Sequence, residues 1–128
     1  MARQYQAERS IVRQYAQVIG VVVIVVGVVG LLLGDARRLI VFNIDLVEDI
    51  VHLATGGLMA YVGFAGRDIG LARNVVGGLG VVYLLVGILG FIVPTLFGLL
   101  PHGLNIWDNL LHLSLGVLGI VVAWFIRR

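Results

Sequence analysis

Long apolar runs dominate this chain and constrain its fold more than any other feature. The first run, from Tyr15 to Leu33, is interrupted only by Gln17. The other three extend over about Leu46 to Ala65, Asn74 to Leu100 and Ile106 to Ile126. A helix of about 20 apolar residues crosses the roughly 30 Å hydrocarbon core of a bilayer. The sequence therefore predicts an all-α integral membrane protein with four transmembrane helices packed as a bundle.

The composition excludes a water-soluble surface. Hydrophobic residues make up 60% of the 128 residues and charged residues 12%, whereas a soluble domain carries about 25% charged residues. All nine lysine-or-arginine positions are arginines, placed near the ends of the apolar runs. They form no solvated basic face with interleaved aromatic residues, so we expect the lipid bilayer, and not nucleic acid, as their partner. The absence of cysteine excludes disulfide bonds and thiolate chemistry.

The arginines also predict the orientation of the chain. One side of a four-span arrangement carries most of them: Arg3, Arg9, Arg13, Arg67, Arg73, Arg127 and Arg128. The other side carries Arg37 and Arg38. The positive-inside rule then predicts a multi-pass protein of a bacterial or archaeal inner (cell) membrane, with both termini in the cytoplasm. A basic start before an apolar run also fits a signal peptide, but this run has a counterpart later in the chain, which favours a retained helix.

The sequence repeats itself with an offset of 60 positions, the separation of His52 from His112. At this offset several identical residues align: Arg13 with Arg73, Gly20 with Gly80, and Gly56 with Gly116. Each copy holds two apolar runs, so both copies enter the membrane from the same side. We therefore expect one membrane domain, residues 1–128, built from tandem parallel two-helix repeats at about 13–66 and 73–126. Glycines seven residues apart, at Gly20, Gly27 and Gly34, predict close helix packing.

Each repeat opens its second helix with an acid four residues before a histidine. Positions four apart share one face of a helix, so Glu48 and His52 form one polar stripe, and Asp108 and His112 form another. With their neighbours these residues make a candidate buried cluster of acids, amide and histidines near the outer face: Glu48, Asp49, His52, Asp108, Asn109 and His112.

The simplest interpretation of these stripes is structural. Asp45 followed by Glu48, and Asn105 followed by Asp108, predict helix caps with a capping-box acid. The histidines would then hold the bundle together through hydrogen bonds to neighbouring helices. Their candidate partners are Thr55, Ser114, Asn109 or a carboxylate.

Three other uses of the stripes stay open. A divalent transition metal could be held by His52, His112, Glu48 and Asp108. Haem could be ligated on its two faces by His52 and His112. An oligomer could conduct protons or a small solute past a lining of Asp49, His52, Asn109 and His112.

The two motifs resemble those of the small four-span bacterial membrane proteins of a domain-of-unknown-function family, the one numbered 4383. The segment from Asp108 to Gly116, with Asn109, His112 and Leu113, is similar to the motif that opens the fourth helix in that family. The segment from Asn43 to Gly56 is similar to the earlier motif, but Glu48 and Asp49 stand where the family tends to have His and Asn. The resemblance implies fold and location, and no activity.

No nucleophile elbow, phosphate-binding loop or zinc-protease motif occurs in the sequence. We therefore expect a structural or interaction subunit of a membrane and not an enzyme, without a cofactor, and with another membrane protein or a second copy of the chain as its partner.

Overall fold

The structure is a computed structural model that describes residues 10–34 and 36–127. Its main elements are α2 (Ile11–Leu33), α3 (Leu46–Ala60), α4 (Ile69–Ile92) and α5 (Ile106–Ile120). Five-residue π-helical segments continue two of them: η1 (Tyr61–Ala65) extends α3, and η2 (Val121–Phe125) extends α5. The chain is mostly helical, as the apolar runs predict. Arg3, Arg9 and Arg128, which contribute to the predicted orientation, lie outside the described residues.

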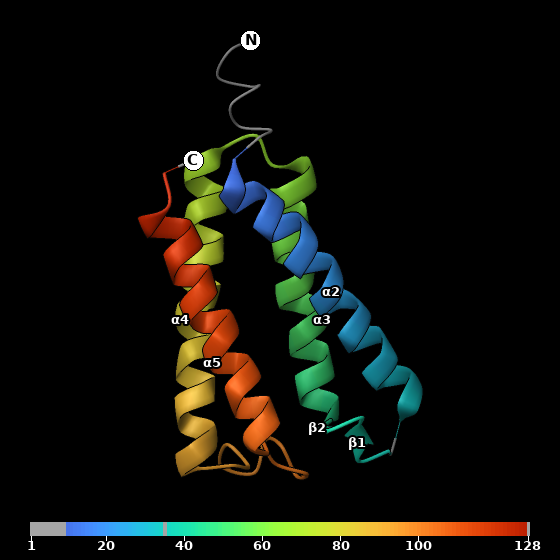
Figure 1. Cartoon of the computed structure of the whole chain (residues 1–128). Coiled ribbons are helices and arrows are strands. Elements are labelled where there is room, and N and C mark those ends of the chain that lie inside the picture. Colours follow the sequence, from blue (N-terminus) through green and yellow to red (C-terminus); the bar gives the residue numbers. More distant parts are fainter. Residues whose placement is uncertain (1–9, 35, 128) are drawn as a thin grey trace.

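The helices pack in pairs (Figure 1). The first hairpin consists of α2, α3 and η1, and the second hairpin of α4, α5 and η2; within each hairpin the two helices pack along their length. In the described part of the chain, three helices are long and apolar enough to cross a membrane: Ile11–Leu33, Ile69–Ile92 and Ile106–Phe125. The protein is therefore a membrane-spanning protein by length and composition. The segment α3 does not meet this description, because Glu48, Asp49 and His52 lie in its first two turns.

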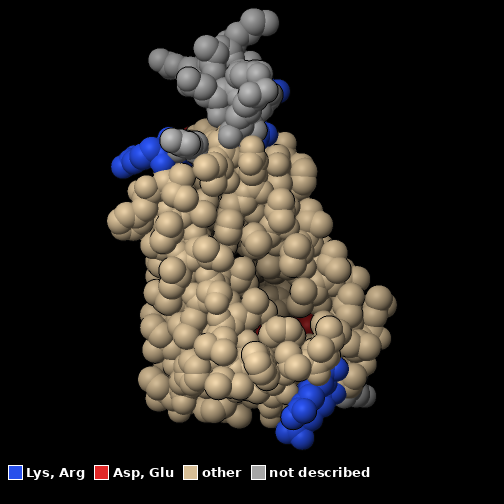
Figure 2. All heavy atoms as spheres, in the orientation of Figure 1, with Lys and Arg blue, Asp and Glu red and all other residues tan. Residues whose placement is uncertain are grey.

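The two ends of the molecule are formed by different segments of the chain. The described chain begins and ends at one of them, the terminal end, which also holds the connection at 66–68 (Figure 1). The opposite end, the polar end, is formed by residues 36–45 and 93–105 together with the starts of α3 and α5. On the face drawn in Figure 2, arginine side chains lie at both ends, and between them the surface consists of residues other than Lys, Arg, Asp and Glu, apart from acidic atoms in a hollow.

Glycines allow the two helices of each hairpin to approach closely. A Cβ atom on Gly20 would lie 2.7 Å from the backbone nitrogen of Ala60, and one on Gly116 would lie 2.6 Å from that of Leu84. Real side chains do not tolerate such distances, so both positions require glycine. Gly27 continues the predicted seam, because a Cβ atom there would lie 2.9 Å from the Asp49 carbonyl oxygen. The third predicted position, Gly34, does not belong to the seam: it ends α2 with a φ of 59°.

Arginine side chains close each hairpin at the terminal end. Arg13 donates from Nε to the carbonyl oxygen of Gly63 at 2.7 Å and from Nη2 to that of Phe64 at 3.3 Å. Arg73 donates from Nη1 to the carbonyl oxygens of Ala123 at 2.6 Å and Ile126 at 2.8 Å. The last carbonyls of a helix lack partners within the helix. In each hairpin, an arginine at the start of the first helix therefore supplies donors to the end of the second.

Two apolar clusters hold the hairpins against each other. The cluster nearer the terminal end joins Val12, Ala16 and Val62 of the first hairpin to Ala72, Val76, Val122 and Ala123 of the second. A smaller cluster, deeper in the molecule, joins Val23 and Met59 to Tyr83. Toward the polar end the contacts between the hairpins are mainly polar.

The connections at the polar end are short and irregular. Residues 36–45 contain a two-stranded antiparallel ladder between β1 (Arg38–Leu39) and β2 (Phe42–Asn43). The third apolar run extends to about Leu100, but α4 ends at Ile92 and turns follow. Pro94 near the end of this run predicts that the helix kinks or stops there, because proline has no N–H to donate and is incompatible with continuing the helix.

Candidate functional site

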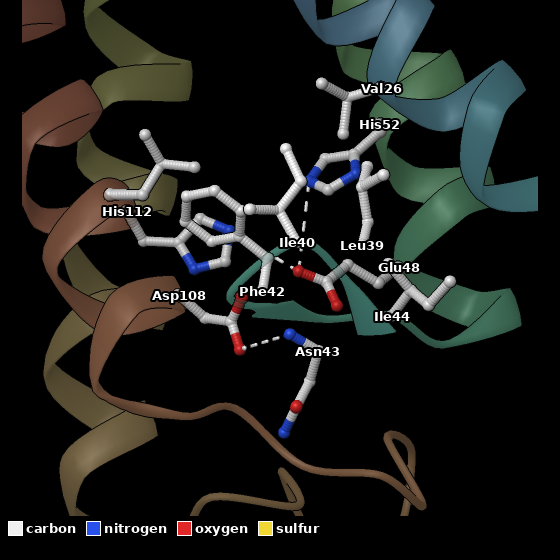
Figure 3. Close-up of a pocket in the computed structure, with 11 residues that line it drawn as sticks. Val26, Leu39, Ile40, Phe42, Asn43, Ile44, Glu48, His52, Asp108 and His112 are labelled. Atoms are coloured by element: carbon white, nitrogen blue, oxygen red, sulfur yellow. Dashed lines mark hydrogen bonds and ion pairs between the residues drawn. The ribbon is translucent and has the colours of Figure 1, made fainter. Parts of the chain in front are cut away.

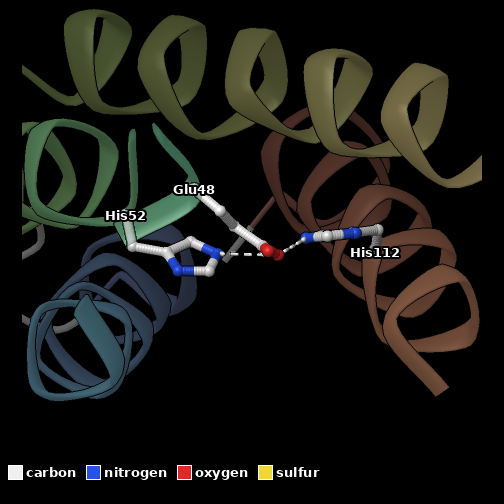
Figure 4. Close-up of side chains that lie close together, drawn as sticks. All are labelled: Glu48, His52 and His112. Atoms are coloured by element: carbon white, nitrogen blue, oxygen red, sulfur yellow. Dashed lines mark ion pairs between the residues drawn. The ribbon is translucent and has the colours of Figure 1, made fainter. Parts of the chain in front are cut away.

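A carboxylate lies between two imidazoles in the interior of the polar end (Figure 4). Glu48 Oε1 lies 4.0 Å from His52 Nε2 and 3.8 Å from His112 Nε2. Glu48 and His52 are one turn apart on α3, and His112 comes from α5, so both hairpins contribute. We call these three residues the histidine–glutamate cluster. The repeat predicts that the two imidazoles meet, and the structure brings their ring centroids to 6.3 Å.

Aromatic packing positions the second imidazole. The His112 ring stacks on the Tyr83 ring, with centroids 5.8 Å apart and planes inclined by 9°. The Tyr83 side chain is buried, and its hydroxyl shares a hydrogen bond with Thr55 Oγ1 at 2.7 Å. Helix α4 thus fixes the orientation of a histidine that belongs to α5. The sequence indicates Tyr83 only as a core or interface aromatic residue.

The cluster is buried but incompletely satisfied. The side chains of His52, Glu48 and His112 are 14%, 10% and 5% exposed. Glu48 Oε2, His52 Nδ1 and His112 Nδ1 are buried atoms without a hydrogen-bond partner. A buried polar group without a partner costs about 1–3 kcal/mol. A water molecule or an ion bound to these three atoms would remove this cost.

Cavities lie on two sides of the cluster. One, of about 210 Å³, is lined by all three cluster residues and by Asp108, and its other walls are mainly apolar (Figure 3). The second, of about 160 Å³, is lined by Glu48 and His112 and by aliphatic residues of α3, α4 and the 96–104 segment. Figure 2 shows acidic side-chain atoms at the base of a hollow in the surface. A small molecule or water therefore has space next to the side chains of the histidine–glutamate cluster.

Asp108 does not join the cluster, which corrects the four-residue metal set. Its Oδ2 accepts hydrogen bonds from the backbone nitrogens of Asn105 at 2.8 Å and Asn43 at 3.2 Å. Asn105 Oδ1 accepts in turn from the nitrogens of Trp107 and Asp108, which completes the capping box predicted for α5. The Asp108 side chain is one methylene shorter than that of Glu48 and remains at the helix start.

Asp49 and Asn109 also lie outside the cluster, contrary to expectation. The Asp49 carboxylate packs against Gly30 of α2, and the Asn109 amide packs against Gly90 of α4. Both side chains are buried within their own hairpin. They point to the first helix of that hairpin because Asp49 follows Glu48, and Asn109 follows Asp108, by one residue, which corresponds to a rotation of about 100° around the helix.

Asp45 does not cap α3, although it occupies the N-cap position. Its Oδ1 instead accepts from the backbone nitrogen of His102 at 3.1 Å, and His102 Nδ1 donates to the carbonyl oxygen of Ile44 at 2.6 Å. Asn43 adds bonds from Nδ2 to the carbonyl oxygens of His102 and Gly103. These contacts fasten the first hairpin to the 102–105 segment. The sequence contains no signal for His102, which lies in a loop between proline and glycine.

Of the partners expected for the histidines, Thr55 and Ser114 bond elsewhere, and a carboxylate lies beside both rings. Thr55 bonds to Tyr83 across the two hairpins, and Ser114 Oγ donates to the carbonyl oxygen of Leu110 in its own helix. Of the partners considered for the imidazoles, a carboxylate, Glu48, lies closest. A haem between His52 and His112 does not fit, because the Glu48 carboxylate occupies the space between the rings (Figure 4).

The comparisons with known proteins identify a family and add no activity. Residues 13–125 match the family described as Domain of unknown function (DUF4383). The chain belongs to this family. The resemblance carried by the two sequence motifs is thereby confirmed for DUF4383, over both hairpins. No curated protein and no solved structure matches the chain.

Proposed function

We propose that this DUF4383 protein crosses a bacterial or archaeal cell membrane four times and acts there as a structural or interaction subunit. The observation that carries the number of spans is the packing of α3 and η1 along α2. Ala16 and Gln17, near the start of α2, lie against Gly63, and Gly30, near its end, lies against Asp49. A helix that accompanies a membrane-spanning helix over this length lies at the same depths. The polar residues of α3 face the protein interior, as intramembrane ionisable residues do.

Matching contacts support a duplicated hairpin. Gly20 and Gly80 face Ala60 and Ile120, and Gly27 and Gly87 face Leu53 and Leu113. Each of these pairs, like the arginines that close the hairpins, is separated by the 60 positions of the sequence repeat. Two copies of one hairpin related by an axis along the membrane normal account for this agreement.

The arginines support an orientation with the terminal end in the cytoplasm. Arg13, Arg67, Arg73 and Arg127 belong to the terminal end, and Arg37 and Arg38 to the polar end. The excess at the terminal end follows the positive-inside rule. The polar end, with its loops at 36–45 and 93–105, then lies on the outer side.

A structural role is supported by where the polar contacts lie. At the polar end, Asn43, Asp45 and His102 connect the loops of the two hairpins. Much of the remaining surface consists of exposed aliphatic and aromatic side chains, for example Leu32, Ile92 and Phe125. Such a surface suits lipid or the helices of a partner protein. We propose no catalytic activity for it.

Cysteine labelling tests the topology, because the chain has no cysteine of its own. Single cysteines at Ile40 and Phe97, both exposed at the polar end, should react in intact cells with a membrane-impermeant maleimide. A single cysteine at Arg67 should react only after the cells are permeabilised. Labelling of all three from outside, or of Ile40 and Phe97 on opposite sides, would exclude the four-span arrangement.

Photo-crosslinking tests the role as a subunit. A photoreactive amino acid at Leu32 or Ile92, which are 81% and 71% exposed, should form adducts with a second protein or a second copy of the chain in living cells. The same probe at Val76, which is buried, is the control and should give none. If the exposed positions crosslink to lipid alone, the subunit role is wrong.

A further inference from the structure

We propose that Glu48, His52 and His112 bind a divalent first-row transition-metal ion, with at least one coordination position facing the adjoining cavities. Each residue offers one ligand atom, and the three atoms lie within 4.8 Å of one another. Two imidazoles and one carboxylate suit ions such as Zn²⁺, Fe²⁺ and Co²⁺, whereas Mg²⁺ and Ca²⁺ prefer oxygen ligands. The donor set thus identifies the class of ion.

The positions of the ligand atoms are close to those that coordination requires. Donor atoms in a tetrahedral site with bonds of about 2.1 Å lie about 3.4 Å apart. The Glu48 oxygen lies 4.0 Å and 3.8 Å from the two histidine Nε2 atoms. Small side-chain rotations therefore suffice to close the site. Two of the ligands are held one turn apart on α3, and the third is oriented by its stacking on Tyr83.

Buried carboxyl groups at the polar end favour a cation. Asp45, Glu48, Asp49 and Asp108 are all buried, and the other three interact electrostatically with Glu48. Among the described residues, the basic side chains within ion-pairing distance of Asp45 and Glu48 are histidines. Ionised groups in an interior are normally paired or coordinate a metal. A divalent ion would stabilise the ionised form of Glu48 without any arginine entering the interior.

The atoms without partners fit the same arrangement. Glu48 Oε2 is available as a second carboxylate ligand, and the Nδ1 atoms of both histidines remain free to donate outward when Nε2 binds the metal. A ligating histidine usually donates its other ring N–H to an oxygen. The cavities of about 210 and 160 Å³ beside the cluster residues have room for water molecules.

Three protein ligands leave the coordination shell open. Sites with three protein ligands keep water or another exchangeable ligand in the fourth position. In this protein that position faces cavities bounded mainly by aliphatic side chains. The metal ion therefore has space for a small exchangeable ligand.

Cobalt(II) titration of the full-length wild-type protein tests the proposal. The protein is purified in detergent through a tag without histidine, stripped with a chelator and titrated with Co²⁺ alone. We expect visible d–d absorption of a low-coordinate site that saturates at a single ion per chain and is removed by Zn²⁺. Zinc-edge X-ray absorption of the wild-type protein should then show two imidazole ligands. Absence of the saturable bands, or a zinc spectrum without imidazole, would overturn the proposal.

Variants then test which residues bind the ion. His52→Ala, His112→Ala and Glu48→Gln should each weaken Co²⁺ binding by more than about 100-fold, beyond the range typical of outer-shell partners. The matched control is His102→Ala, which removes the remaining histidine and should leave the d–d spectrum and the stoichiometry unchanged. The proposal is supported if His102→Ala binds Co²⁺ as the wild type does and the three cluster variants lose Co²⁺ binding. Binding that survives His52→Ala with His112→Ala shows an adventitious ion and contradicts it. Circular dichroism and gel filtration identify variants that fail to fold. If the cluster variants do not fold, the cobalt and zinc spectra of the wild-type protein decide whether the proposal holds.

Discussion

The two hairpins share one frame, by which we mean the arginine contacts at the terminal end and the close helix contacts at glycines. They differ in what their polar residues do. Both close with an arginine at the terminal end, and both bring their helices together at glycines. The acid of the first hairpin, Glu48, extends into the interior and lies between two imidazoles. The equivalent acid of the second, Asp108, remains at the helix start and accepts from two backbone nitrogens. A difference of one methylene thus separates a carboxyl group in the cluster from one that caps a helix.

This difference shows how two similar hairpins can place equivalent residues in different roles. The frame places two acids and two histidines at matching positions, and their side-chain lengths then assign the roles. The first hairpin supplies the cluster with Glu48 and His52, and the second supplies His112 with Tyr83 behind it. At the positions equivalent to Tyr83 and Thr55 the chain has Val23 and Leu115, so the hydrogen bond between the hairpins has no counterpart. Substitutions at matching positions can separate the shared frame from these differences.

The largest effect on the free energy of unfolding is expected where the two helices of a hairpin approach most closely. Gly56→Ala and Gly116→Ala place a methyl group 2.8 Å from the Ile24 nitrogen and 2.6 Å from the Leu84 nitrogen, and neither backbone can yield without separating the helices. Each variant should lose about 3 kcal/mol of free energy of unfolding, at the upper end of typical overpacking. Gly57→Ala, with nothing within 4 Å, is the control and should change stability by less than about 1 kcal/mol. SDS-induced unfolding in mixed micelles measures these differences. Tolerance of alanine in only one hairpin would show that the two frames differ.

The second prediction compares the arginines at the terminal end. Arg73→Gln should cost about 2 kcal/mol of free energy of unfolding, because two hydrogen bonds from a charged group are lost. Arg13→Gln should cost about half as much, because Gln17 Nε2 still donates to the carbonyl oxygen of Gly63 at 2.8 Å. The second hairpin has Gly77 at the matching position and no such reserve. Arg67→Gln, at an exposed residue, serves as the control. Equal losses for the two variants would show that Gln17 contributes nothing.

The third prediction separates the two acids. In metal-free protein, Asp108→Ala should lower the free energy of unfolding by about 1 kcal/mol, because the nitrogens of Asn105 and Asn43 lose their acceptor. Glu48→Ala should lower it by less than half of that, because α3 begins without a side-chain cap bond. The same unfolding measurement after chelation compares the two variants. A larger loss for Glu48→Ala would mean that the carboxylate stabilises the fold even without an ion.

A small effect, close to that of Glu48→Ala, is expected at the hydrogen bond that joins the hairpins and has no counterpart at the matching positions. Thr55→Val and Tyr83→Phe should each cost about 0.6 kcal/mol, the average for hydrogen bonds between membrane helices. Thr55→Val also removes the bond from Oγ1 to the Val51 carbonyl oxygen within α3, so the double variant should cost no more than Thr55→Val alone. Additive losses in this double-mutant cycle would show that the two hydroxyls are not coupled.

The helices could be predicted from the sequence because their signals are local. The apolar run from Leu46 to Ala65 coincides with α3 and η1, and Pro94 marks the end of α4 within two residues. Asn105 and Asp108 form the predicted capping box, because all its atoms lie within one turn of chain. The approach of the imidazoles followed from the repeat.

Roles that depend on distant segments could not be predicted. Asp45 has the sequence of a helix cap, but its carboxylate accepts from His102, 57 positions away. Asp49 and Asn109 differ from the cluster residues by one position, and only the packed glycines of α2 and α4 show which way they face. Arg13 and Arg73 align in the sequence repeat. Their charge predicts the orientation of the chain in the membrane, but it does not predict that they donate to the end of the second helix of each hairpin.

The division of the cluster between the hairpins has a consequence for synthesis. While the ribosome has released only the first hairpin, Glu48 and His52 are in place and His112 has not been made. The buried carboxylate then awaits its second imidazole until α5 has been made and has packed against the first hairpin. A product that lacks α5 leaves Glu48 with His52 as its only imidazole in the cluster.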